Sequence, residues 1–134
     1  MESRHVSVWV DARPEAVYEF AADPHTWPRW AAGLAEGGLR QTPDGWVADS
    51  PMGEVTVEFA PPNQFGVLDH IVRLPSGEAV YNPMRVVPGG SPGSSGCEVV
   101  FAVRRRPGMS DEQFEADVAA VTADLATLRR LIAG

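Results

Sequence analysis

The sequence has one cysteine, three histidines and no long apolar run. Because Cys97 has no second cysteine beside it, an internal disulfide and a local thiolate metal site are excluded, and we expect Cys97 to be a small core residue. No stretch of about 18 apolar residues is present to span a bilayer. Residues 1–5 lead directly into an alternating pattern, without the basic and apolar leader of a secreted protein. We therefore expect a cytoplasmic protein that does not insert into membranes.

Basic side chains are also scarce, at 11 against 18 acidic ones, which gives a net charge of -7. This charge repels phosphate backbones and anionic lipid surfaces at long range, so nucleic acid is not an expected partner. The one basic run, residues 104–106, ends an apolar segment and is interpreted as the solvated end of a strand. The length of 134 residues and the hydrophobic content of 44% are ordinary for a single domain, which we expect to span residues 1–134.

Motifs for metal, cofactor or hydrolase chemistry are missing or out of context. His5, His25 and His70 occur at no metal-binding spacing, and no phosphate-cradling glycine loop precedes a helix, so neither a metal nor a cofactor is expected. Residues 89–93 spell the hydrolase motif G-x-S-x-G, which works only on a tight turn from strand to helix. Here they lie in a Gly/Ser-rich segment before a strand, so a hydrolase is not supported.

Periodicity predicts the elements near the start of the chain. Residues 5–10 alternate apolar and polar side chains, as a strand does, without indicating which face meets the core. A proline suited to a first turn and a helical spacing of apolar residues predict a short helix over about 14–22. An Asp-Pro pair ends that helix, and a second short helical segment follows with Trp27 and Trp30.

The middle of the chain is predicted to form a meander of antiparallel strands. Between residues 34 and 106, Pro, Gly, Asn and Asp turn signals recur at intervals close to the 8 to 12 residues typical of consecutive strands, which predicts about six strands. The signals include a turn at 51–53 and a Gly/Ser-rich hairpin loop at 89–96. Residues 54–60 and 65–73 are expected to pair as a hairpin.

The C-terminal segment has the clearest helical pattern. Ser110 and Gln113 fit a capping box, and acidic residues at the start and arginines at the end suit the helix dipole. One apolar stripe predicts a continuous helix over 110–132 of about 33 Å, formed by Phe114, Val118, Val121, Leu125, Leu128 and Ile132. We therefore expect an α+β fold: a curved antiparallel sheet of about seven strands wrapped on this helix, with two short helices after the first strand.

This order of elements, with Ala-Arg-Pro-Glu-Ala-Val-Tyr at residues 12–18 and the segment 22–30, resembles the SRPBCC superfamily, also called START-like or helix-grip proteins. Residues 65–70, 84–88 and 107–110 resemble a bacterial subgroup labelled polyketide cyclase-like. The resemblance covers essentially the whole chain and implies a cavity between sheet and helix. The superfamily includes lipid carriers, hormone receptors, aromatase/cyclases and chaperone activators, so the resemblance implies a fold more than a chemistry.

His70 is the first candidate for chemistry. Alternation over residues 65–74 places it on one face with Leu68 and Val72, toward the expected cavity, and places Asp69 on the opposite face. A histidine there is a hydrogen-bonding group of the pocket, a general acid/base with an unperturbed pKa near 6.5, or a wall residue satisfied by a neighbour. Asp69 cannot orient it within one straight strand, because adjacent side chains point to opposite faces.

Neighbouring elements supply the other candidates. Asn82 interrupts an apolar strand face, as a pocket group or as a turn residue bonded to its own main chain. Trp27 and Trp30 lie where short helices would close one end of a cavity, although core packing is the more usual role of such rings. The predicted ligand-binding residues are His70, Asn82, Trp27, Trp30, Leu68, Val72, Met84, Phe101, Phe114 and Val118. His70 is the candidate catalytic residue.

Three functions stay open at this point. The first is binding of a small hydrophobic molecule, aromatic or polyketide-like, in the cavity. The second is a cyclase, dehydratase or isomerase in which His70 moves a proton and Asn82 or Arg85 polarises a carbonyl. The third is a protein-interaction module similar to the chaperone activators. The sequence indicates neither the ligand nor whether the protein is a monomer or a dimer.

Overall fold

The computed structural model describes residues 1–31, 37–50, 53–90 and 95–133. Within these ranges the chain forms β1 (Ser3–Val10), α1 (Pro14–Ala22), η1 (Pro24–Thr26), α2 (Trp27–Trp30), β2 (Leu39–Thr42), β3 (Gly45–Ser50), β4 (Gly53–Phe59), β5 (His70–Arg73), β6 (Ala79–Asn82), β7 (Met84–Pro88), β8 (Cys97–Arg104) and α4 (Asp111–Ala133). The α+β architecture and the short helices after the first strand confirm the prediction. The turn expected at 51–53 and the loop at 89–96, including its G-x-S-x-G letters, fall partly on residues 51–52 and 91–94, outside the described residues.

The described strands number eight, where the sequence predicted about seven. The difference arises at Pro83, which separates β6 from β7 within what was expected to be one strand. Proline has no N–H to donate to a neighbouring strand, so the ladder is interrupted there. The sheet is accordingly divided in two antiparallel parts, ordered β1-β8-β7 and β2-β3-β4-β5-β6.

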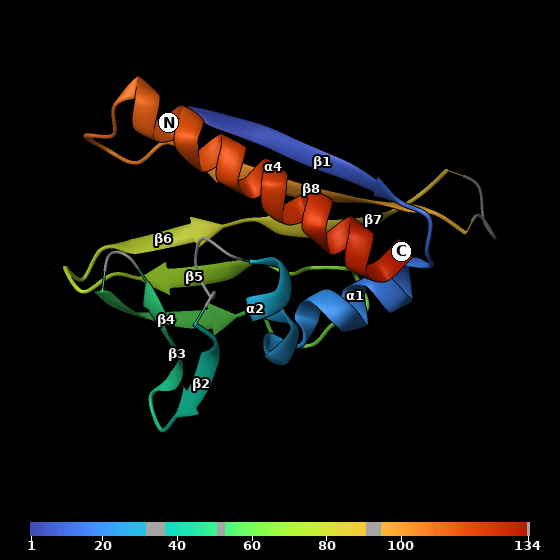
Figure 1. The fold of residues 1–134 in the computed structure, drawn as a ribbon, viewed down its shortest axis with the longest axis horizontal. Coiled ribbons are helices and arrows are strands. Elements are labelled where there is room, and N and C mark those ends of the chain that lie inside the picture. Colours follow the sequence, from blue (N-terminus) through green and yellow to red (C-terminus); the bar gives the residue numbers. More distant parts are fainter. Residues whose placement is uncertain (32–36, 51–52, 91–94, 134) are drawn as a thin grey trace.

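The two sheets curve around α4, which crosses in front of β1 and β8 (Figure 1). In this view α1 lies below the C-terminal half of α4, and α2 lies below its middle, between α1 and the strands β2 to β6. The face of β1 that meets the core carries Val6, Val8 and Val10, whereas Trp9 is 46% exposed on the outside. The tertiary structure thus determines the orientation of β1, which the alternation alone left open.

The expected pairing of residues 54–60 with 65–73 holds for the second half of the later segment. Val57 of β4 lies opposite Val72 of β5, and Phe59 lies opposite His70. The first half turns instead toward β7, where the Leu68 N–H donates to the Met84 carbonyl at 2.8 Å. Gly66 permits this approach, because its φ is +73° and a Cβ there would lie 2.3 Å from the Val86 carbonyl oxygen.

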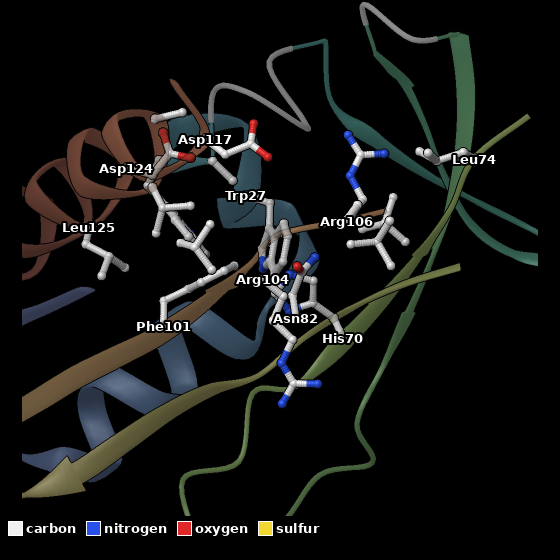
Figure 2. Close-up of a pocket in the computed structure, with 17 residues that line it drawn as sticks. Trp27, His70, Leu74, Asn82, Phe101, Arg104, Arg106, Asp117, Asp124 and Leu125 are labelled. Carbon is white, nitrogen blue, oxygen red and sulfur yellow. The ribbon is translucent and has the colours of Figure 1, made fainter. Parts of the chain in front are cut away.

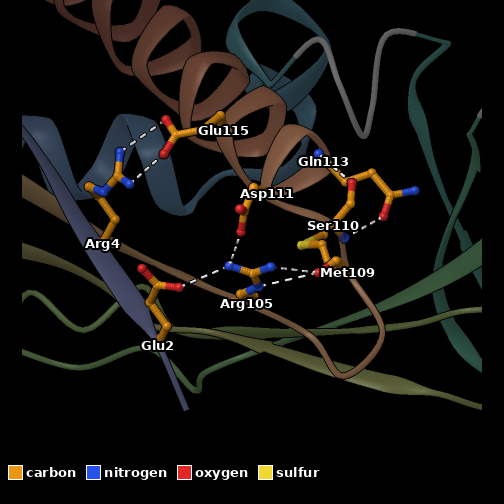
Figure 3. A network of polar contacts seen from close by, with 8 residues as sticks. All are labelled: Glu2, Arg4, Arg105, Met109, Ser110, Asp111, Gln113 and Glu115. Atoms are coloured by element: carbon orange, nitrogen blue, oxygen red, sulfur yellow. Dashed lines mark hydrogen bonds and ion pairs between the residues drawn. The ribbon is translucent and has the colours of Figure 1, made fainter.

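The helix α4 begins with the predicted capping box. The Gln113 N–H donates to Ser110 Oγ at 3.1 Å, and the Ser110 N–H donates to Gln113 Oε1 at 2.9 Å. Arg105 was expected to be a solvated strand end, yet its guanidinium donates to the Met109 carbonyl and forms ion pairs with Glu2 and Asp111 (Figure 3). These contacts connect the end of β8 to the start of α4, and Figure 3 also shows Arg4 paired with Glu115 one turn later.

The apolar stripe of α4 faces the core as predicted, and the helix is continuous through the described residues. Phe114, Leu125 and Leu128 are fully buried, and Cys97 is a buried core residue. The stripe supplies one layer of a core whose other layer is the inner face of the strands. Among the described residues, no helix is long and apolar enough to cross a membrane.

Candidate functional site

A cavity of about 250 Å³ lies between α4, α2 and the inner faces of β5, β6 and β8 (Figure 2). Most of its wall is apolar, with a few polar side chains at defined places, as is usual for small-molecule sites. The lining residues are Trp27, Trp30, Ala31, His70, Val72, Leu74, Val80, Asn82, Phe101, Val103, Arg104, Arg106, Asp117, Ala120, Val121, Asp124 and Leu125.

Six of the ten residues predicted to bind ligand line this cavity, namely Trp27, Trp30, His70, Val72, Asn82 and Phe101. The other four lie elsewhere. Leu68 borders a separate hollow of about 20 Å³, and Met84 is fully buried in the core. Phe114 and Val118 pack against Val103 and Met109 near the start of α4. These four face the interior as expected, but at points where other side chains fill it.

The reason lies in the face that α4 turns to the cavity. That face carries Asp117, Ala120, Val121, Asp124 and Leu125, spaced by three and four residues and therefore aligned along the helix. It overlaps the apolar stripe only at Val121 and Leu125. Hydrophobic periodicity identifies the buried stripe of a helix, so it did not indicate the two aspartates beside it. Their spacing of seven residues, which puts them on one face, is the signal that could have done so.

His70 is the most buried polar residue of the cavity wall, with 3% of its surface exposed. Its ring is surrounded by aromatic rings, with centroids 4.9 Å from Trp27 and 5.8 Å from Phe101. Nδ1 lies 3.0 Å from the Leu68 carbonyl oxygen. Because a carbonyl only accepts, Nδ1 carries the proton and Nε2 is the acceptor of the neutral ring. Burial lowers the pKa of His70 to about 4, so the ring is neutral at pH 7.

The Nε2 atom of His70 is directed at the cavity. No described residue donates a hydrogen bond to it, whereas every fully buried side-chain nitrogen or oxygen of the described residues has a partner. Nε2 must therefore keep accessible surface, and the ring lies in the cavity wall (Figure 2). The result is a neutral acceptor with an open lone pair in largely apolar surroundings.

Asn82 lies directly opposite His70 on the neighbouring strand. Side chains of directly opposed residues share a face and stand about 5 Å apart at Cβ. Figure 2 shows the Asn82 amide beside the His70 ring, and no described residue hydrogen-bonds that amide. The alternative of a turn residue bonded to its own main chain therefore finds no support in the described contacts. The amide offers both a donor and an acceptor next to the lone pair of His70.

The tryptophans contribute ring surface and no hydrogen-bonding capacity. The indole N–H of Trp27 donates to the Ala21 carbonyl at 2.9 Å, and that of Trp30 donates to Thr26 Oγ1 at 3.3 Å. Both residues are 3% exposed, and their rings are 4.9 Å apart. With their only donors occupied, they present carbon surface to the cavity.

Charged side chains lie around the cavity at the side of α4. Asp117 and Asp124 come from the helix, and burial raises the pKa of Asp117 while Arg106 opposes that change. Arg106 itself is paired with Glu78 at 3.1 Å. The guanidinium of Arg104 points away from the other cavity residues in Figure 2 and lies 5.7 Å from the centre of the Tyr81 ring. The helix side of the cavity is therefore acidic.

Asp69 lies on the opposite face of the sheet, as the alternation predicted, but it is only 6% exposed. Its carboxylate accepts from the Tyr81 hydroxyl at 2.5 Å, from the Met84 N–H at 2.9 Å and from two nitrogens of Arg85 at 2.9 Å. The hydrogen-bonded Arg85 guanidinium holds the pKa of Asp69 far below its usual range. Arg85 is therefore engaged on the outer face, which corrects the prediction that it could polarise a carbonyl in the cavity.

The part of the chain that the structure describes has no cluster of side chains that could bind a metal ion. Within residues 1–31, 37–50, 53–90 and 95–133, no three His, Cys, Asp or Glu side chains gather so that they could hold a metal ion.

Comparisons with known proteins agree with this architecture. Neither protein-family models nor curated protein sequences match the chain. Solved structures do match: XoxI from Bacillus cereus has a TM-score of 0.75 at 15% identity, over 98% of this chain and 96% of that one. A START superfamily protein from Mycobacterium smegmatis has a TM-score of 0.63 at 15% identity, over 97% and 96%. The di-domain ARO/CYC BexL from the BE-7585A biosynthetic pathway has a TM-score of 0.68 at 17% identity, over 97% of this chain and 46% of BexL.

At these identities the similarity concerns the fold. The chain has a START-like, helix-grip fold, as its sequence resemblance predicted. Proteins of one fold differ widely in activity, so the function must be argued from the cavity itself.

Proposed function

We propose that the protein binds a small hydrophobic molecule in the cavity between the sheet and α4. The observation that carries the proposal is a cavity of about 250 Å³ walled by the rings of Trp27, Trp30 and Phe101, with the open acceptor of His70 among them. Apolar walls provide affinity by removing ligand surface from water, and a few fixed polar groups orient the ligand. The START-like fold supports this function at the level of architecture.

A cyclase or dehydratase has the same residues in its favour, because His70 and Asn82 stand side by side at the cavity. The electrostatics favour binding over proton transfer. With its pKa lowered to about 4, His70 is a weak base at pH 7, and general bases are most efficient when their pKa lies near the operating pH. Arg85, the other group considered for carbonyl polarisation, is bonded to Asp69 on the outer face.

Blocking the cavity tests the proposal. Both Ala119 and Ala120 are exposed on α4, but only Ala120 lines the cavity. Ala120→Trp should fill the space and abolish binding, and Ala119→Trp should leave binding unchanged, since the two substitutions add the same bulk to the same helix.

The measurement is native mass spectrometry of freshly purified protein for a retained small molecule, followed by calorimetric titration of the unloaded protein with 2-naphthol. Equal binding by both variants would place the ligand outside the cavity and contradict the proposal. Circular dichroism of each variant checks that α4 stays folded.

A further inference from the structure

The cavity's hydrogen-bonding groups, volume and charge each restrict the ligand, and together they indicate its chemical class. The inference rests on the proposed binding function and goes beyond it. His70 is 97% buried and its Nε2 lone pair, unpartnered by any described residue, is directed at the cavity, so an apolar ligand would leave that acceptor without a partner. Such a loss is costly, which favours a ligand with a hydrogen-bond donor.

The neighbouring amide makes the requirement more specific. Asn82 stands opposite His70 and offers an N–H donor beside the Nε2 acceptor. A hydroxyl group is able to donate to Nε2 while it accepts from the Asn82 amide. An ether can only accept, and a hydrocarbon can do neither.

The volume sets the size of the ligand's body. A cavity of about 150 Å³ holds benzene, and drug-sized ligands occupy about 300 Å³ or more. At about 250 Å³ this cavity suits one or two fused rings. Flat rings also match the indole and phenyl surfaces of Trp27, Trp30 and Phe101, whose walls offer stacking or edge contacts.

The charged side chains around the cavity restrict the charge that a ligand can carry. Asp117 and Asp124 face the cavity from α4, Arg106 is paired with Glu78, and Arg104 points away toward Tyr81. A carboxylate ligand would meet the carboxylate of Asp117 at the exposed side of the cavity, where like charges repel. The helix side therefore disfavours anions.

We infer that the cavity binds a neutral aromatic alcohol of one or two rings, with its hydroxyl placed between His70 Nε2 and the Asn82 amide. The aromatic body lies against Trp27, Trp30 and Phe101, and the acidic face of α4 excludes carboxylate analogues. His70 and Asn82 thus determine specificity, and no chemical step is implied.

Three probes of one ring system test this assignment at pH 7 by calorimetry: 2-naphthol, 2-methoxynaphthalene and 2-naphthoate. The wild-type protein should bind 2-naphthol about tenfold more tightly than the ether, as one hydrogen bond to a buried acceptor provides. It should bind 2-naphthoate more weakly than either. In protein labelled with ¹⁵N-histidine, the Nε2 resonance of His70 should move when 2-naphthol binds and stay in place with the ether.

Variants separate the hydroxyl contact from ring packing. His70→Phe keeps a ring and removes the acceptor, so the preference for 2-naphthol should fall to within about twofold while the ether binds as before. His25→Phe is the matched control, because His25 is an exposed histidine outside the cavity, and it should keep the full preference. If His70→Phe does not fold, Asn82→Leu tests the same hydroxyl contact and should also reduce the preference for 2-naphthol. The ¹⁵N shift of wild-type His70 then tests the contact with Nε2.

The outcomes distinguish this inference from the proposed function. Equal affinity for 2-naphthol and the ether, with an unmoved Nε2 resonance, would overturn the assigned class while leaving the cavity a binding site. Binding of 2-naphthoate as tightly as 2-naphthol would overturn the role of the acidic face. Binding of none of the three probes would overturn the binding function as well.

Discussion

At the scale of single residues, His70 combines a structural and a functional constraint. The hydrogen bond from Nδ1 to the Leu68 carbonyl determines which nitrogen carries the proton, and burial among aromatic rings keeps the imidazole neutral. A neutral acceptor held in this way is suited to recognise a donor on a ligand. The same burial makes protonation costly, so it links the stability of the protein to pH.

That linkage gives a measurable prediction. The pKa of His70 is about 4 in the folded protein and near 6.5 when unfolded, so below pH 6.5 the unfolded state binds the additional proton. The contribution of His70 to the free energy of unfolding is therefore fully present above pH 6.5. It is lost as the pH falls toward 4, which lowers the free energy of unfolding by about 2 to 3 kcal/mol between pH 7 and 4.5. Urea unfolding of the wild type and of His70→Phe across this range measures the difference.

The variant lacks the titrating group and should lose correspondingly less stability over this range. Parallel profiles for wild type and His70→Phe would show that His70 is not buried in the neutral form.

At the scale of elements, the turn before β5 decides where His70 stands. The chain leaves β4, bridges to β7 through Val67 and Leu68, and then enters β5 at His70. Gly66 makes the bridge possible, because its positive φ and the close Val86 carbonyl leave no room for a side chain. The position of the polar cavity wall thus depends on one glycine outside the cavity.

Gly66→Ala should destabilise the protein by at least about 2 kcal/mol, since it adds a steric clash to the strain of a positive φ. Gly108→Ala is the matched control: Gly108 has a similar φ of +80°, but no atom lies within 4 Å of where its Cβ would be. It should cost about 1 kcal/mol. Urea midpoints of the two variants compare them, and equal losses would mean that the contact with Val86 is not constraining.

At the scale of the whole molecule, Asp69 connects the two sheets. Its carboxylate bonds Tyr81 of β6 on one side of Pro83 and Met84 and Arg85 of β7 on the other. Pro83 interrupts the backbone ladder at this point, and the Asp69 carboxylate bonds residues on both sides of the interruption. The arrangement accounts for a carboxylate that is buried on the outer face of the sheet.

Asp69→Asn should lower the free energy of unfolding by about 2 to 3 kcal/mol, because it removes the charge that Arg85 pairs with and leaves a poorly matched buried amide. Arg85 is half exposed and can be rehydrated, which keeps the loss below that of a fully buried pair. Glu58→Gln is the control, since it removes an exposed ion pair with Arg73 and should cost less than about 1 kcal/mol. Chemical denaturation at pH 7 measures both, and similar losses would contradict the role of Asp69.

Much of this arrangement was determined by the sequence itself. The period-two pattern placed His70 and Asp69 on opposite faces, the period of α4 identified its buried stripe, and Ser110 with Gln113 marked where that helix begins. These features depend on neighbours only a few residues apart, because backbone geometry alone sets which side chains share a face.

Only the tertiary structure decided which part of each face meets the cavity. Phe114 and Val118 belong to the apolar stripe, yet the crossing of α4 over the sheet places Asp117, Ala120 and Asp124 at the cavity instead. The occupied indole N–H groups, the burial of Asp69 and the open lone pair of His70 likewise depend on partners from other parts of the chain. Periodicity specifies the direction of a side chain, whereas the space in front of that side chain depends on how distant elements pack.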